Sequence, residues 1–116
     1  MTVLDKIIAK KAQRLLEQKA AFPLSEIKKI GAETSPRDFF SAVSRNDSEP
    51  LKLIAEIKHA SPSEGIIRHD FNLRDIARTY EQCRVNAVSI LTEEDFFKGQ
   101  LSYIEAAKEF LSCPVL

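Results

Sequence analysis

Residues 51–58 read LKLIAEIK, a short and largely apolar run that ends on a glutamate and a lysine. Polar residues that favour turns flank the run, at 46–50 before it and at 59–71 after it. A short apolar run between such segments is typical of a strand that is buried in a parallel sheet. We therefore expect residues 51–58 to form the first strand of an α/β fold.

The same kind of segment recurs further along the chain, with an amphipathic stretch after each of the first two strands. Regular alternation of strands and helices predicts crossover connections and a parallel sheet. The expected order is a strand at 51–58, a helix from Leu73 to about Cys83 capped by Asn72, a strand at 87–91, a helix at 101–111 and the start of a third strand at 114–116.

Helices are expected ahead of the first strand, because apolar residues recur there at spacings of three and four. Capping residues and helix breakers set the expected boundaries. The prediction is a helix over 3–21 that begins at a Thr2–Asp5 capping box, a helix over 24–30 that ends at Gly31, and a helix that starts at Ser35-Pro36 with Phe39, Phe40 and Val43 on its apolar side.

The predicted fold class is α/β, a partial (β/α)8 TIM barrel preceded by an N-terminal helical extension. Residues 1–116 are expected to form one incomplete barrel domain, with the extension at 1–48 and the first strands and helices at 51–116. A closed barrel takes eight strands and typically ~250 residues, and the sequence ends inside the third predicted strand. We therefore expect the chain to be a truncated barrel with an open sheet edge.

The strongest candidate for chemistry is the pair Glu56 and Lys58. Side chains alternate along a strand, so both residues share one face with Ile54, about 6.6 Å apart at ~3.3 Å per residue. They lie at the carboxyl end of an apolar strand, the end that holds the active site in α/β barrels. The alternatives are a purely structural ion pair, and a lysine that extends into the following loop.

Two loops carry weaker signals. Ser61-Pro62-Ser63-x-Gly65 offers hydroxyl and amide groups to phosphate or carboxylate oxygens, although the same residues are common in ordinary turns. Phe96 and Phe97 lie in the acidic loop at 92–100, where one ring could stack on an aromatic substrate or where both could pack on the neighbouring helix.

Composition excludes several classes of protein. Lysine plus arginine equals aspartate plus glutamate at 17 each, which argues against a nucleic-acid or anionic-membrane partner. Cys83 and Cys113 form no metal-binding or disulfide pattern and are expected to be small buried hydrophobic residues. No secretory leader or apolar span is recognisable, so we expect a cytoplasmic protein.

These motifs resemble the indole-3-glycerol phosphate synthase family of tryptophan biosynthesis. The resemblance is carried by residues 53–58 (LIAEIK), by the Ser61-Pro62-Ser63 loop with Gly65, Ile67, Arg68, Asp70 and Phe71, and by residues 89–93 (SILTE) with Phe96, Phe97 and Gly99. The opening Leu4-Asp5-Lys6-Ile7 and the step at residues 23–26 (PLSE) are similar to the family's N-terminal helical extension.

The resemblance implies a carboxy-lyase that closes the indole ring of 1-(2-carboxyphenylamino)-1-deoxyribulose 5-phosphate with loss of CO2 and water. It implies a small phosphosugar substrate and no metal or organic cofactor. Lys58 would bind anionic groups of the substrate and act in acid catalysis, and Glu56 would be its acid/base partner. Ser61 would hold one end of the substrate, and Phe97 would contact the aromatic ring.

Family members bring further catalytic residues on a Lys-Asp-Phe segment and on later strands, which this sequence lacks. Residues 1–116 alone are therefore expected to be inactive. One alternative is another phosphosugar barrel of similar layout, against which the Ser-Pro-Ser and Phe-Phe loops count. The other is a non-catalytic interaction module, which binds a partner or self-associates through the helix at 3–21 or the open sheet edge.

Overall fold

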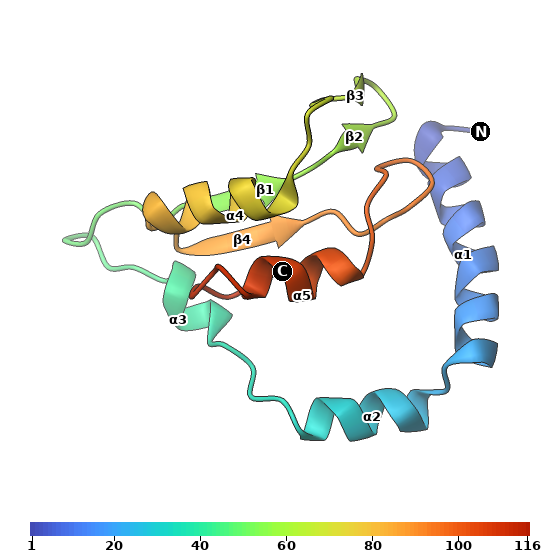
Figure 1. The fold of residues 1–116 in the computed structure, drawn as a ribbon, viewed down its shortest axis with the longest axis horizontal. Coiled ribbons are helices and arrows are strands. Elements are labelled where there is room, and N and C mark those ends of the chain that lie inside the picture. The colour runs from blue at the N-terminus through green and yellow to red at the C-terminus, as the bar shows by residue number, and fades with distance from the viewer. The chain divides into compact units, whose positions relative to one another are not determined.

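The computed structural model describes residues 1–116 and divides them into two compact units, Met1–Pro36 and Arg37–Leu116. The first unit holds two helices, and the second holds every strand together with three helices (Figure 1). The boundary between the units places the third helix with the strands. None of the helices is long and apolar enough to cross a membrane.

Helix α1, Val3–Ala21, begins where the capping box predicted it. The Thr2 hydroxyl accepts a hydrogen bond from the Asp5 amide at 3.2 Å, and the Asp5 carboxylate accepts one from the Thr2 amide at 2.7 Å. These reciprocal bonds satisfy amide groups that a helix start leaves without partners. The Thr2 hydroxyl, which donates to the Asp5 carboxylate at 2.7 Å, and the Thr2 amide hold the pKa of Asp5 below its usual range. The helix over 3–21 is confirmed.

Helix α2, Leu24–Ala32, follows Pro23 and is longer than predicted. Gly31, expected to end the helix, lies inside it, and the C-cap is Glu33. A glycine ends a helix by adopting a left-handed backbone, but Gly65 is the one glycine of this chain with a positive φ. The Thr34 hydroxyl instead donates to the Gly31 carbonyl oxygen at 3.1 Å.

The second unit begins with α3, Phe39–Val43, which starts later than the Ser35-Pro36 prediction. Asp38 is the N-cap, because its carboxylate accepts the Ser41 amide at 3.0 Å. Phe40 was expected on the apolar side of this helix and is instead 79% exposed. A helix this short presents only part of its circumference to the strands, and its half-buried residues are Phe39, Ala42 and Val43.

The central strands are β1, Ile54–Ile57, and β4, Ala87–Ile90, which pair in parallel with Ile54 opposite Ala87 and Ile57 opposite Ile90. Residues 114–116 pair on the other side of β4: the Val88 amide donates to the Pro114 carbonyl at 3.1 Å, and the Leu116 amide donates to the Val88 carbonyl at 2.9 Å. The expected strand order is confirmed, although the first strand is shorter than residues 51–58.

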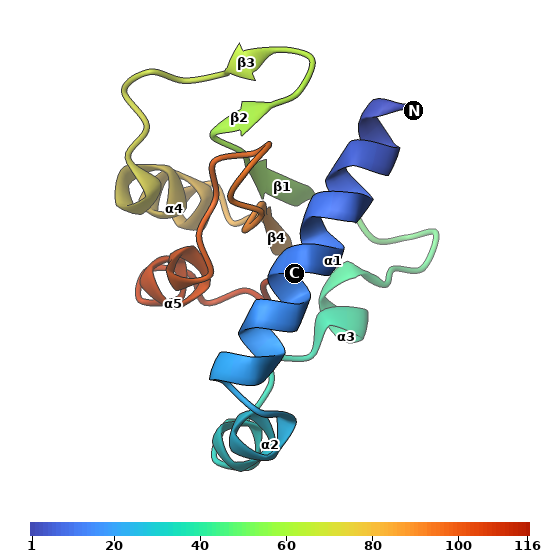
Figure 2. The ribbon, with the colours of Figure 1, turned by 90° about the vertical axis from the view of Figure 1, so that its right-hand side faces the viewer.

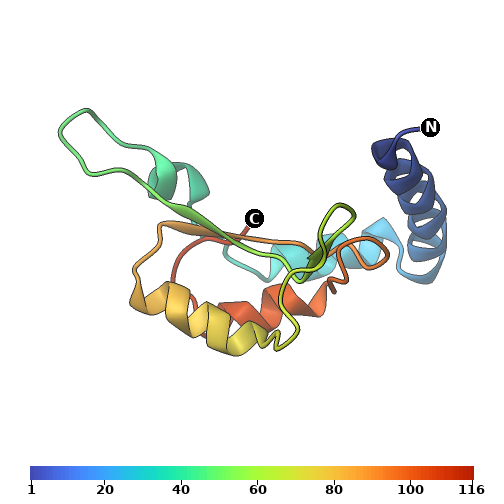
Figure 3. The ribbon, with the colours of Figure 1, turned by 90° about the horizontal axis from the view of Figure 1, so that it is seen from above.

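Helices α4, Leu73–Gln82, and α5, Ser102–Lys108, lie side by side on one face of β1 and β4, and α3 lies on the other (Figures 2 and 3). The Asn72 side chain accepts hydrogen bonds from the amides of Arg74 and Asp75, which confirms the predicted cap. The core between these helices and the strands is formed by Ile57, Leu73, Ala77, Val85, Val88, Ile90, Ala107 and Leu111.

Two expectations are wrong in detail. The segment at 59–71, predicted as a loop, contains a small antiparallel hairpin of β2, Ala60–Ser61, and β3, Gly65–Ile66. The left-handed backbone of Gly65, with φ of 67°, allows the chain to turn back tightly. Cys83, predicted to be buried, is exposed because it forms the C-cap at the end of α4, whereas Cys113 is half-buried.

Candidate functional site

Glu56 and Lys58 form an ion pair at the carboxyl end of β1. The Lys58 Nζ atom lies 2.7 Å from Glu56 Oε1, and the two side chains are 31% and 48% exposed, Lys58 first. They therefore project on the same side of the strand, as the alternation of side chains predicted. A partly exposed pair of this kind adds only about 0–1 kcal/mol to stability, and both side chains remain open to contact by another molecule.

The backbone beneath the pair is held rigidly. Ile57, between the two charged residues, is 2% exposed and points into the core. The Tyr80 hydroxyl of α4 donates to the Glu56 carbonyl oxygen at 2.8 Å. Glu56 also pairs in register with Ser89 of β4. Core packing, a neighbouring strand and a helix thus fix the direction in which Glu56 and Lys58 project.

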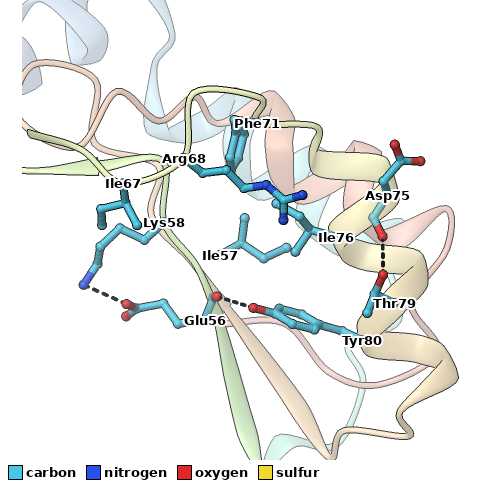
Figure 4. Close-up of a pocket in the computed structure, with 10 residues that line it drawn as sticks. All are labelled: Glu56, Ile57, Lys58, Ile67, Arg68, Phe71, Asp75, Ile76, Thr79 and Tyr80. Carbon is cyan, nitrogen blue, oxygen red and sulfur yellow. Dashed lines mark hydrogen bonds and ion pairs between the residues drawn. The ribbon is translucent and has the colours of Figure 1, made fainter.

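A cavity of about 450 Å³ adjoins the ion pair between β1 and α4. Figure 4 shows Glu56 and Lys58 at one side of it and Tyr80, Thr79 and Asp75 at the helix side. Arg68 also lines it, and its guanidinium, 3.1 Å from the Asp70 carboxylate, holds the pKa of Asp70 below its usual range. Apolar side chains, Ile57, Ile67, Phe71 and Ile76, line the cavity together with these charged and polar groups.

Ser61 does not line this cavity. It is the second residue of β2, just after the buried Ala60, and its hydroxyl accepts the Glu64 amide at 3.2 Å. The Ser63 hydroxyl is 3.4 Å away. The hydroxyl of Ser61 therefore already organises the tight turn of the hairpin, and the same oxygen can still donate its hydrogen to a bound anion.

Phe97 lies in the loop that follows β4, and the structure brings this loop to the hairpin. The Phe97 carbonyl oxygen accepts a hydrogen bond from the Ala60 amide at 3.3 Å. Phe97 is half-buried but is not part of the hydrophobic core beneath the sheet. The backbone of Phe97 is therefore next to the segment that carries Ser61, while Glu56 and Lys58 lie together on the preceding strand.

Several residues that organise this region were given no role by the sequence analysis. The Glu93 carboxylate accepts three backbone amides in the loop after β4. His59 stacks on Phe71 with ring centroids 4.5 Å apart, and Phe71 contacts Tyr103 at 5.7 Å, which braces the hairpin against α5. The sequence signal for this role of Glu93 is local: an acidic side chain can accept hydrogen bonds from the backbone amides that follow it two to four positions later. No three side chains of the types that bind metals are grouped together.

Parallel strands connected by helices place the chain in the α/β class, and the charged pair lies at the carboxyl end of the first strand, the end where α/β proteins in general bind their ligands. The family model for indole-3-glycerol phosphate synthase matches residues 4–116. The chain therefore belongs to the indole-3-glycerol phosphate synthase family.

Curated relatives agree with this assignment. The chain is 45% identical to indole-3-glycerol phosphate synthase of Campylobacter concisus over 116 residues, which cover 98% of the chain and 44% of that relative. It is 43% identical to the Neisseria meningitidis serogroup B enzyme and 44% identical to that of Alkaliphilus metalliredigens, each over 98% of the chain, with 45% and 43% of those proteins covered. The chain thus spans less than half the length of these relatives.

Proposed function

We propose that this chain contributes the first part of the active site of an indole-3-glycerol phosphate synthase. The reaction closes the indole ring of 1-(2-carboxyphenylamino)-1-deoxyribulose 5-phosphate and releases CO2 and water, as a carboxy-lyase. The observation that carries the proposal is the Glu56–Lys58 pair, held at 2.7 Å on the carboxyl end of β1 in a chain of this family.

The ring-closing reaction needs a proton donor and a proton acceptor, which an ammonium and a carboxylate group can provide. Ring closure joins an aromatic carbon to a ketone carbon, so the ketone oxygen must gain a proton as the new bond forms. Departure of the carboxylate as CO2 restores the aromatic ring. A second proton then converts the hydroxyl into departing water, and the ring carbon between the nitrogen and the former ketone carbon loses one proton as the indole double bond forms. An ammonium group can donate the two protons and bind anionic groups of the substrate, and an adjacent carboxylate can accept the proton that the ring releases. We assign the first role to Lys58 and the second to Glu56.

Ser61 and Phe97 complete the proposed site. The Ser61 hydroxyl would donate a hydrogen bond to one end of the phosphosugar substrate from the hairpin after β1. The Phe97 ring would stack on the aromatic part, a contact worth ~1 kcal/mol beyond burial. The hydrogen bond between the Ala60 amide and the Phe97 carbonyl supports this assignment, because it brings the two loops together.

For the fold, we propose that β1, β4 and residues 114–116 are the first three strands of a (β/α)8 barrel. Residues 1–48 would be the helical extension of that one domain, and residues 51–116 its first strands and helices. Three parallel strands with crossover helices on one face support this assignment. The edge of β1 away from β4 has no partner strand, and a barrel-closing strand or a second copy of the chain could occupy it.

The test is turnover by the natural gene product that contains these residues. Lys58→Ala should lower kcat/KM for indole-glycerol phosphate formation by about 10²- to 10⁴-fold, the usual contribution of a proton donor. Lys108→Ala, at an exposed position on α5, is the matched control and should leave turnover unchanged. Unchanged turnover after Lys58→Ala, with normal turnover in the control, would show that the assignment is wrong.

A further inference from the structure

The loop at residues 92–100 has no helix or strand, yet one side chain organises most of its backbone. The Glu93 carboxylate accepts the Asp95 amide at 3.0 Å through Oε1, and the Phe96 and Phe97 amides at 2.7 and 3.2 Å through Oε2. The backbone carbonyl of Glu93 also accepts the Gly99 amide at 2.7 Å. Glu93 therefore bonds to four of the next six residues.

A carboxylate suits this arrangement better than any neutral side chain. It offers two oxygens that accept only, and three consecutive amides of an irregular loop would otherwise need water as their partner. Hydrogen bonds to an ionised acceptor are roughly twice as strong as those between neutral groups. Glutamine keeps one accepting oxygen and turns an NH2 group toward amides that also donate, so it cannot replace all three bonds.

The loop also closes tightly on the end of β4. A side-chain carbon added at Gly99 would lie 2.1 Å from the Leu91 carbonyl oxygen, so the backbone passes Leu91 at a distance that only glycine allows. The preceding residue, Lys98, has a left-handed backbone with φ of 52°. The loop therefore leaves the strand at Thr92 and comes back to Leu91, at the strand end, at Gly99. Between these two points the Glu93 side chain binds the loop backbone.

Phe97 is the residue on which these constraints converge. Its amide donates to the Glu93 carboxylate, and its carbonyl accepts the Ala60 amide of the hairpin. The peptide groups on both sides of Phe97 are thus fixed, so the position of the ring depends chiefly on its own side-chain rotation. Loss of the carboxylate would free the amide side of Phe97 and leave only the contact with Ala60.

We infer that Glu93 is a positioning residue, which holds the loop at 92–100 so that Phe97 presents its ring to the substrate. This inference rests on the proposed function, because the substrate contact of Phe97 belongs to that proposal. Glu93 itself need not touch the substrate. Its effect on turnover should therefore depend on whether the Phe97 ring is present.

The first measurement concerns the loop alone. In the complete gene product, Glu93→Gln should make the amides of residues 95–97 exchange with solvent deuterium about tenfold faster, as expected when a hydrogen bond is weakened. Glu105→Gln, an exposed glutamate on α5, is the matched control and should leave these amides unchanged. Unchanged exchange in Glu93→Gln would overturn the inference. This readout does not depend on catalysis.

The second measurement is a double-mutant cycle on kcat/KM. Glu93→Ala should lower kcat/KM by about 10- to 100-fold in the natural background, the scale expected when a binding group is displaced by about 1 Å. In a Phe97→Ala background the same change should cost less than about threefold, because its target ring is gone. Equal losses in the two backgrounds would show that Glu93 does not act through Phe97.

The two failures can be told apart. If Lys58→Ala leaves turnover unchanged, the proposed function fails, and hydrogen exchange still decides whether Glu93 holds the loop. If Lys58→Ala abolishes turnover but the double-mutant cycle is additive, the proposed function stands and the role of Glu93 is refuted. Thermal unfolding of each variant separates a local effect from general destabilisation.

Discussion

Gly99 gives the sharpest test of how the loop after β4 is built. A side-chain carbon at this position would lie 2.1 Å from the Leu91 carbonyl oxygen and 2.8 Å from the carbonyl carbons of Leu91 and Thr92. Carbon atoms of real side chains essentially never come closer than 3.0 Å to such atoms. In Gly99→Ala the loop must therefore move away from the strand end by about 1 Å, because backbone atoms cannot rotate aside as a side chain can.

The displacement has two expected consequences. Overpacking at a well-packed site costs about 1–3 kcal/mol, so urea should unfold Gly99→Ala at a lower concentration than the natural protein. The shift also weakens the hydrogen bond from the Gly99 amide to the Glu93 carbonyl and moves Phe97. If Phe97 contacts the substrate as proposed, a displacement of about 1 Å should lower kcat/KM up to about 100-fold.

Gly31→Ala is the matched control. Gly31 lies inside α2, and an added carbon meets nothing within 4 Å. Alanine in a helix is favoured over glycine by roughly 0.5–1 kcal/mol, so this variant should be as stable as the natural protein or slightly more stable. The reasoning is refuted if Gly99→Ala keeps the unfolding free energy within about 0.5 kcal/mol and turns over normally.

Two further predictions concern stability. Asn72→Ala removes the cap of α4 and should lower the unfolding free energy by about 1 kcal/mol in urea titrations, while Asn72→Asp should restore it; equal stability of all three proteins would contradict the role of the cap. The Ser112 hydroxyl, at 2.6 Å, and the Ser112 amide, at 2.9 Å, hold the pKa of Glu81 below its usual range. A lowered pKa in the folded state means that Glu81 contributes stability above the ordinary glutamate pKa and loses it as the pH falls through the lowered value. Glu81→Gln should therefore destabilise at neutral pH by no more than about 1 kcal/mol, with a difference that disappears in acid, and a difference independent of pH would contradict it.

Much of the fold was predictable because its determinants are local. The capping box of Thr2 and Asp5 and the cap at Asn72 each join residues no more than three positions apart, so a short stretch of sequence shows both partners of each hydrogen bond. The strand order followed from short apolar runs that alternate with amphipathic stretches along the chain. The shared face of Glu56 and Lys58 followed from the two-residue period of a strand.

The predictions of helix ends and of the hairpin were wrong where a local sequence pattern is compatible with more than one structure. Ser35-Pro36 is a good helix start, but Asp38 lies closer to the helix and its carboxylate takes the Ser41 amide. Glycine at position 31 is typical of a helix C-terminus, but glycine can also adopt the ordinary helical backbone that Gly31 has here. The hairpin of β2 and β3 was missed because each strand has only two residues, too few to show alternation.

The organisation of the candidate site depended on contacts between distant segments. The Tyr80 hydroxyl reaches the Glu56 carbonyl across 24 positions of sequence, and Arg37 donates to the Leu111 carbonyl across 74. The sequence by itself determined which residues form helices and strands, and that a carboxylate and an ammonium share the end of the first strand. Only the tertiary structure decided which loop adjoins the hairpin after that strand, because the hydrogen bond from the Ala60 amide to the Phe97 carbonyl joins residues far apart in the sequence and forms only after the helices and strands have packed.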